Sequence, residues 1–318
     1  MDIRYLDPLT RAFGRMKQAL FQPFDLKKWL VVGFTAFLAE LTDCEGGNGP
    51  GKGGAGRGGR GIDWDAVIYA PRRGKEWLLE NPDWTVAIAF GLLLLLVLLI
   101  VLTWLSSRGK FMFLDNVVHN RAQVAAPWRE FRTDGNSLFL WSIMFNLVAL
   151  AAVISYLASC YQEIVQIYEH FGDPSALLRP AIVMVLKFIG ILLVVGLVDL
   201  LLVDFVVPIM YRSRVGVLNA WGMFFPLVGA YLFSFIAYGL FVLVLSIAVV
   251  IAVIGAVLLT CCIGAIPLII PYIGTVILLP ISYTMRAFSV EFLEQFGPEF
   301  KVFPPDREGE STGVPTPA

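Results

Sequence analysis

Four ionisable side chains of this sequence lie within or at the edge of long apolar stretches: Glu40, Lys187, Asp199 and Asp204. A charge inside a bilayer is costly, so each of them is a candidate for moving an ion or a proton. The other interpretation is that they form interhelical ion pairs and anchors, with Glu40 at a depth where it could meet Lys187. We favour anchoring, because one charge-bearing helix makes a poor relay. In addition, Asp199 and Asp204 lie about 140° apart around a helix and do not form a carboxylate pair.

Other patterns that carry chemistry are weak in this sequence. His119 follows Asp115 by four residues, which places both on one helix face, but the same side lacks the further His or Cys ligands of a metal site. The stretch from Gly46 to Lys52 resembles the start of a phosphate-binding loop, but Gly53 replaces the required Ser or Thr. The sequence also holds no nucleophile-elbow pattern and no dinucleotide fingerprint. We therefore predict no catalytic residue, no metal and no cofactor.

The four cysteines give one specific prediction. Cys44, Cys160, Cys261 and Cys262 all fall near the outer ends of predicted spans. Adjacent cysteines rarely bond to each other, so a Cys44–Cys160 disulfide is the specific possibility. We favour the alternative, in which the cysteines are buried and free and act as small hydrophobic residues.

The composition shows which elements must position these residues. Of 318 residues, 58% are hydrophobic and 15% are charged, and the mean hydropathy is +0.75. Soluble domains hold about 25% charged residues, so the sequence indicates an integral membrane protein and excludes a soluble or disordered chain. The net charge of −1 gives no basic field for nucleic acid.

The fold class that follows is an all-α, polytopic membrane bundle of six transmembrane helices plus cytoplasmic interfacial amphipathic helices. A span needs roughly 20 apolar residues. We expect a single transmembrane domain over 1–300, an outside Gly-rich loop over 42–84 and a disordered cytoplasmic tail over 301–318. The predicted spans lie near 24–41, 85–107, 137–160, 181–207, 226–256 and 264–288.

The first span is the doubtful one, because only eleven uncharged residues separate Lys28 from Glu40. The distribution of Lys and Arg decides in its favour. Six spans place sixteen of these cations on one side and seven on the other, whereas five spans give ten and thirteen. The positive-inside rule therefore predicts six spans in the cytoplasmic membrane, with both termini cytoplasmic.

The segment over 4–21 has the spacing of an amphipathic helix lying in the membrane interface. Its basic residues Arg11, Arg15 and Lys17 are expected to contact anionic lipid headgroups, and Trp128 and Trp221 lie in related positions before later spans. The chain could be three units of one design, each an interfacial helix followed by an out-and-back pair of spans. The alternative is that aromatic, basic segments before spans are general anchors.

Several short strings carry a resemblance to a known family. They are 21–30 (FQPFDLKKWL), 108–116 (RGKFMFLDN), 127–131 (PWREF), 204–211 (DFVVPIMY) and 286–289 (RAFS). With these strings the chain resembles an uncharacterised family of six-helix prokaryotic membrane proteins. That family is loosely similar to the membrane domain of glycerophosphodiester phosphodiesterases. The soluble phosphodiesterase barrel and its acidic metal-binding motifs are absent here, so the resemblance implies a topology and no catalytic residue.

The leading prediction is a non-enzymatic helical bundle that organises lipid or a partner protein through its basic, aromatic cytoplasmic face. The expected partners are membrane lipids and, as the other candidate, a second membrane protein. One alternative is a small-solute or ion transporter that uses Lys187, Asp199 and Asp204. The other is a lipid-modifying membrane enzyme, which would need polar residues converging from several helices.

Overall fold

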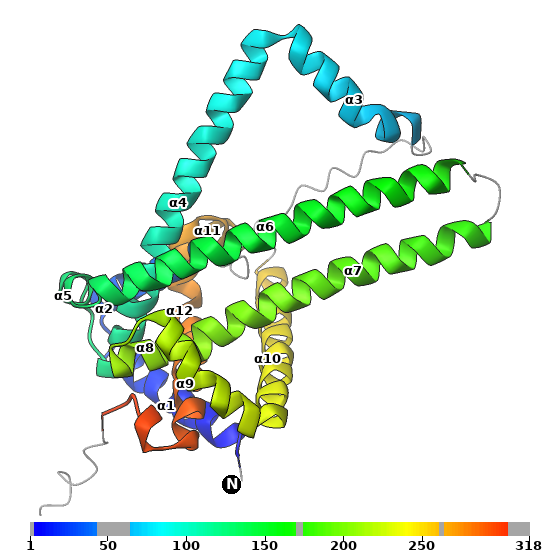
Figure 1. Cartoon of the computed structure of the whole chain (residues 1–318). Helices are drawn as coiled ribbons and strands as arrows, with labels where there is room; N and C mark the ends of the chain where they lie inside the picture. Colours follow the sequence, from blue (N-terminus) through cyan, green and yellow to red (C-terminus); the bar gives the residue numbers. More distant parts are fainter. Residues whose placement is uncertain (1–2, 43–63, 170–173, 261–263, 305–318) are drawn as a thin grey trace, which may run out of the picture.

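The computed structural model describes residues 3–42, 64–169, 174–260 and 264–304, and these ranges are helical and contain no strands (Figure 1). Five apolar segments are long enough to cross a membrane. They lie in α4 (Pro82–His119), α6 (Arg132–Glu169), α7 (Pro174–Leu201) with its continuation, α10 (Leu232–Leu259) and α12 (Pro271–Leu293). The first four bury little of their apolar stretches, as expected of side chains that face lipid, whereas the segment in α12 is 44% buried. The all-α prediction is confirmed, and the five helices support a membrane-spanning protein.

The first predicted span corresponds to α2 (Leu26–Glu40), which has 15 residues. Such a helix is about 22 Å long, shorter than the hydrocarbon core of about 30 Å. It lies beside the C-terminal part of α4, where Lys28 Nζ donates to Asn120 Oδ1 at 2.7 Å. At its other end, Thr42 Oγ1 donates to Ser106 Oγ at 2.9 Å. The count of six spans therefore stays a prediction.

Two other predicted spans are interrupted by a non-helical residue. In the stretch predicted over 226–256, α9 (Val217–Ala230) ends before Tyr231, and α10 begins after it. In the stretch predicted over 264–288, α11 (Ala265–Ile269) and α12 are separated by Ile270, whose ψ is 113°. Ile270 precedes a proline, and the residue before a proline is disfavoured in the helical region.

The predicted outside loop over 42–84 is only partly a loop. Residues 64–80 form α3 (Trp64–Glu80), which holds the single glycine Gly74 and an Arg72–Glu76 ion pair one turn apart. Such a composition supports a helix, whereas the glycines that favour flexible chain lie in 46–61, outside the described residues. Most of the tail predicted as disordered also lies outside them.

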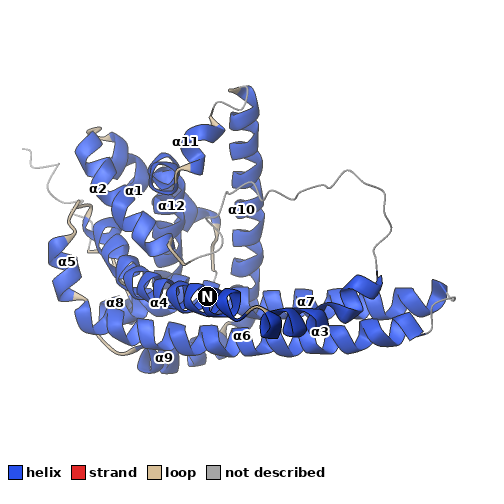
Figure 2. Ribbon diagram, turned by 90° about the horizontal axis from the view of Figure 1, so that it is seen from above, coloured by secondary structure: helices blue, strands red, loops and turns tan. Residues whose placement is uncertain are grey.

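The buried core lies at one end of the molecule. It consists of the ends of three helices that return to this side, 103–118 of α4, 202–211 of η2 (Leu202–Val206) and α8 (Val207–Ser213), and 283–293 of α12. Aromatic rings fill it, and Phe111, Phe205 and Phe288 are 0% exposed. We call this core, with α1 (Leu6–Phe21), α2 and α9 around it, the junction. Away from the junction extend α4 with α3, the pair of α6 and α7, and α10 (Figures 1 and 2).

Short helices surround the junction in a regular order. The six-residue α5 (Ala125–Glu130) contacts α4, and α9 contacts η2 and α8, so each lies against the return helix that precedes it in the chain. The N-terminal α1 takes the corresponding place against α12, the last return helix. This order is compatible with three units of one design, which stays a prediction.

Candidate functional site

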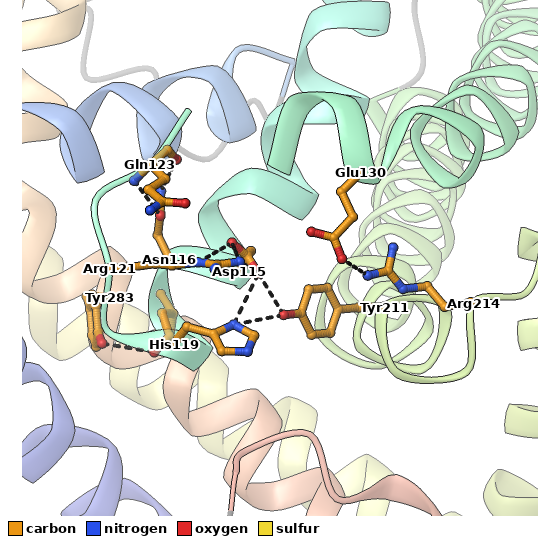
Figure 3. Close-up of polar contacts among 10 residues, drawn as sticks. Asp115, Asn116, His119, Arg121, Gln123, Glu130, Tyr211, Arg214 and Tyr283 are labelled. Carbon is orange, nitrogen blue, oxygen red and sulfur yellow. Dashed lines mark hydrogen bonds and ion pairs between the residues drawn. The ribbon is translucent and has the colours of Figure 1, made fainter. Parts of the chain in front are cut away.

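A buried carboxylate organises one side of the junction. Asp115, near the end of α4, is 1% exposed, accepts hydrogen bonds from the side chains of Arg121 and Tyr211, and lies in contact with His119 (Figure 3). Arg121 binds it in a bidentate manner, with Nε 3.0 Å from Oδ2 and Nη2 2.8 Å from Oδ1. The Tyr211 hydroxyl donates to Oδ1 at 2.9 Å, and His119 Nδ1 lies 3.1 Å from the same oxygen. A buried charge needs such partners, so the network joins α4, the following loop and α8.

The loop after α4 is held by a second buried polar residue, Asn116. Its amide exchanges two hydrogen bonds of 3.0 Å with the backbone of Gln123, and its Nδ2 lies 3.2 Å from Thr35 Oγ1 of α2. Asn120 ends α4 in the left-handed conformation, with φ of 50°. The loop is therefore fixed at both ends, which aims Arg121 back at Asp115. The arrangement stabilises the fold, and it also brings the Tyr211 hydroxyl within 3.2 Å of His119 Nδ1.

A second buried carboxylate, Glu291 of α12, binds two basic residues of α1. Arg11 Nε lies 2.9 Å from Glu291 Oε2, and Arg15 Nε lies 2.6 Å from Oε1, while the Glu291 side chain is 3% exposed. Arg11 and Arg15 therefore hold α1 against the protein, and their contact with lipid headgroups stays a prediction. The third predicted lipid contact, Lys17, is exposed.

The turn between α1 and α2 carries an exposed aromatic cluster. Phe21 and Phe24 each place their ring centroid 5.6 Å from that of Trp29, and they are 46% and 60% exposed. Trp29 is fixed by its Nε1, which donates to the Leu20 carbonyl at 2.8 Å. Lys17 and Lys27 are exposed on the same two helices. We call these five residues the α1–α2 face.

An open groove of about 410 Å³ lies where α4, α5 and α6 meet, and three arginines and two tryptophans line it. We call it the arginine groove; its residues are Trp104, Arg108, Trp128, Arg129 and Arg132. Trp128, which the sequence predicts as a lipid contact, is therefore one of the residues that line this groove. Its ring packs edge-on against Trp104, with 5.5 Å between centroids.

Arg108 is the most constrained residue of the arginine groove. It is 7% exposed, and its guanidinium carbon lies 4.4 Å from the Trp104 ring centroid and 4.8 Å from that of Trp128. Its Nη2 donates to Asn136 Oδ1 at 3.0 Å, whereas its buried Nε has no hydrogen-bond partner within the described ranges. The side chain crosses Gly135 of α6, where a Cβ would lie 2.9 Å from Arg108 Cγ.

The ionisable residues of the apolar stretches contact different helices. Lys187 of α7 pairs with Glu163 of α6 at 2.6 Å, rather than with Glu40. Asp204, in the π-helical turn η2, accepts a hydrogen bond of 2.9 Å from the Tyr238 hydroxyl of α10. Asp199 and Glu40 are half-buried, on α7 and at the end of α2. Lys187 and Asp204 therefore have separate partners, on α6 and on α10.

Two further predicted sites have mixed outcomes. Trp221 is 7% exposed and stacks on Trp141 and Phe225, so the structure places this ring inside the protein rather than at a lipid surface. Cys160 is buried, but Cys44 lies outside the described residues, so the disulfide stays a prediction. Among the residues that the structure describes, no three His, Cys, Asp or Glu side chains gather as metal ligands would.

The long apolar helices, together with a core buried at one end, indicate a membrane-spanning protein. The chain belongs to DUF7544, a family of unknown function, whose model matches residues 4–300. No curated protein and no solved structure matches the chain. The family match agrees with the expected membership of an uncharacterised family, and the likeness to the phosphodiesterase membrane domain stays an expectation.

Proposed function

We propose that this chain is a non-catalytic, multi-pass protein of the cytoplasmic membrane that organises anionic lipid, with the α1–α2 face as its lipid contact. The observation that carries the proposal is the exposure of Phe21 and Phe24 beside Trp29, with Lys17 and Lys27 exposed on the same two helices. Aromatic rings flanked by lysines are the usual composition of a membrane interface. Cations near an anionic surface add about 1 kcal/mol each to its binding.

The Glu291 contacts support this role, because they fix which side of α1 faces outward. Met16 and Leu20 are buried on the inward side, and Phe13 is 56% exposed on the outward side. A helix held in this way presents its apolar residues to the bilayer without leaving the protein. Its ordering is provided by the fold, so binding lipid needs no further folding step.

The proposed topology keeps six spans, with α2 as the short first one and both termini in the cytoplasm. The unequal distribution of sixteen and seven cations supports this orientation. It places the junction, the α1–α2 face and the arginine groove at the inner surface, where anionic lipids are enriched.

The alternative functions have less support. A transporter would bring Lys187, Asp199 and Asp204 to one water-filled path, but Lys187 binds Glu163 and Asp204 binds Tyr238, which favours an anchoring role. A lipid-modifying enzyme would need a reactive group with an adjacent base. In the densest polar network, the Tyr211 hydroxyl lies 3.2 Å from His119 Nδ1, but this hydroxyl is on a buried residue and donates to the Asp115 carboxylate, which favours a structural role.

The full chain in nanodiscs of mixed zwitterionic and anionic lipid tests the proposal. We expect K17E/K27E to lower the enrichment of anionic lipid around the protein at least about fivefold, because two attractive charges become repulsive. Native mass spectrometry of the lipids that remain bound measures this enrichment. The matched control, R73E/K75E, reverses two exposed charges of α3 and should leave it unchanged. Equal enrichment in both variants would refute the proposal.

A further inference from the structure

The arginine groove holds three positive charges without a compensating carboxylate. Among the described residues, no ion pair is found for Arg108, Arg129 or Arg132, although elsewhere Glu291 binds two arginines and Asp115 binds one. Arg132 lies close enough to Arg108 to act on it as a like charge. Three cations at close quarters repel one another unless an anion lies between them.

Within the described ranges, the buried Nε of Arg108 lacks a hydrogen-bond acceptor. A guanidinium offers five donors in a rigid fork, and burial makes each unused donor costly. Here one donor reaches Asn136, and the buried Nε has none within the described ranges. The two tryptophan rings stabilise the cation through their faces but accept no hydrogen bond as strong as that of an oxygen anion.

The geometry favours a phosphoryl group over a carboxylate. A phosphoryl group presents several oxygens, which can meet more than one guanidinium, whereas a carboxylate is satisfied by one arginine fork. A groove of about 410 Å³ that is open to the outside has room for the phosphoryl group together with a substituent on one oxygen. The indole rings of Trp104 and Trp128 form apolar walls for that substituent.

We propose that the arginine groove binds a phosphoryl anion, which Arg108, Arg129 and Arg132 hold between the rings of Trp104 and Trp128. The source of the phosphoryl group is an anionic phospholipid headgroup or free inorganic phosphate. The site lies at the meeting of α4, α5 and α6 and uses none of the residues of the α1–α2 face. It therefore does not depend on the function proposed above.

The test uses the full chain with nitrogen-15-labelled tryptophan in a neutral detergent, so that each indole N–H gives one NMR signal. Inorganic phosphate and a short-chain phosphatidic acid are added separately, with acetate at equal ionic strength as the anion control. We expect saturable shifts of the Trp104 and Trp128 signals with phosphatidic acid, with or without shifts from phosphate. Shifts from both ligands assign the site to the phosphoryl group alone, and shifts from the lipid only assign it to the headgroup.

Arg108 is buried, so its replacement could unfold the chain, and the exposed pair serves as the test. R129Q/R132Q should weaken binding at least about tenfold, because two charge-assisted hydrogen bonds are lost. The control R4Q/K301Q removes two exposed charges outside the groove and should leave binding unchanged. As a second variant, G135A should also weaken binding, because its Cβ displaces the Arg108 side chain.

Three results would overturn the proposal. The first is the absence of any saturable shift of either signal. The second is an equal response to acetate and to the phosphoryl ligands. The third is equal binding by R129Q/R132Q and by the R4Q/K301Q control. None of these results bears on the α1–α2 face, whose test reverses Lys17 and Lys27.

Discussion

Two carboxylates occupy similar places in the junction and are held in different ways. Asp115 and Glu291 lie near the ends of two return helices, α4 and α12, and both are almost completely buried. Asp115 binds an arginine only six residues further along the chain, so the loop after α4 supplies its charge partner. Glu291 binds Arg11 and Arg15, which lie at the opposite end of the sequence.

The difference separates two kinds of structural role. Removal of Asp115 would leave two hydrogen-bond partners without their acceptor, the Arg121 guanidinium and the Tyr211 hydroxyl. The arginines do not separate the two sites, because the Arg121 side chain is 34% exposed, between Arg15 at 27% and Arg11 at 56%. The difference is Tyr211, a buried side chain of α8 that ties Asp115 into the core, whereas Arg11 and Arg15 tie Glu291 to α1. We therefore expect Asp115 to control the stability of the whole fold and Glu291 to control the attachment of α1.

The largest effect is expected from D115A. Removing one member of a buried ion pair leaves its partner uncompensated, which costs about 3–5 kcal/mol in the free energy of unfolding. Denaturation of the full chain in mixed detergent micelles, followed by tryptophan fluorescence, measures this loss. The control is D7A, which removes an exposed carboxylate and should change stability by less than about 1 kcal/mol. A loss no larger than that of D7A would contradict the role assigned to Asp115.

A smaller effect on global stability is expected from E291Q, about 1.5–3 kcal/mol, because hydrogen bonds to charged groups are lost but the arginines can hydrate. Its distinguishing effect is local: α1 should exchange its amide hydrogens faster, while α4 keeps its protection. Hydrogen exchange read by mass spectrometry measures both helices in one experiment. R15Q should produce most of this effect and R11Q less, since Arg15 is the less exposed. Unchanged exchange in α1 would show that other contacts hold it.

The sequence predicted the apolar helices because their signal is local. The predicted stretches over 85–107 and 137–160 fall within α4 and α6, since an unbroken run of apolar residues is sufficient evidence for a span. The same criterion missed how far α4 continues. The string from Arg108 to Val118 mixes charged and polar residues with apolar ones, and it is buried because α2, α8 and α12 pack around it.

The candidate sites could not be predicted for the same physical reason. Asp115 and His119 have the spacing of an exposed polar helix. The Tyr211 hydroxyl that donates a hydrogen bond to Asp115 comes from 96 residues away in the sequence. In the sequence, Arg129 and Arg132 have the pattern of ordinary cytoplasmic cations. The groove forms because Gly135 has no side chain, which leaves room for Arg108 between α4 and α6. Arg11 and Arg15 have the pattern of lipid contacts, because nothing near them in sequence indicates the buried Glu291.

The smallest effect is expected from Y211F. This substitution tests the neutral partner of Asp115, Tyr211, while its charged partner, Arg121, stays in place. The substitution removes the 2.9 Å hydrogen bond and keeps the ring, which stacks on Phe131 with 4.8 Å between centroids. Because Arg121 still neutralises the carboxylate, the expected loss is about 1 kcal/mol in the free energy of unfolding. The double variant D115A/Y211F gives the control: with the acceptor gone, removing the buried hydroxyl should cost nothing further, so its stability should be no lower than that of D115A. If Y211F alone were as damaging as D115A, the hydroxyl and not the arginine would be the main partner, and the contrast with Glu291 would have to be drawn differently.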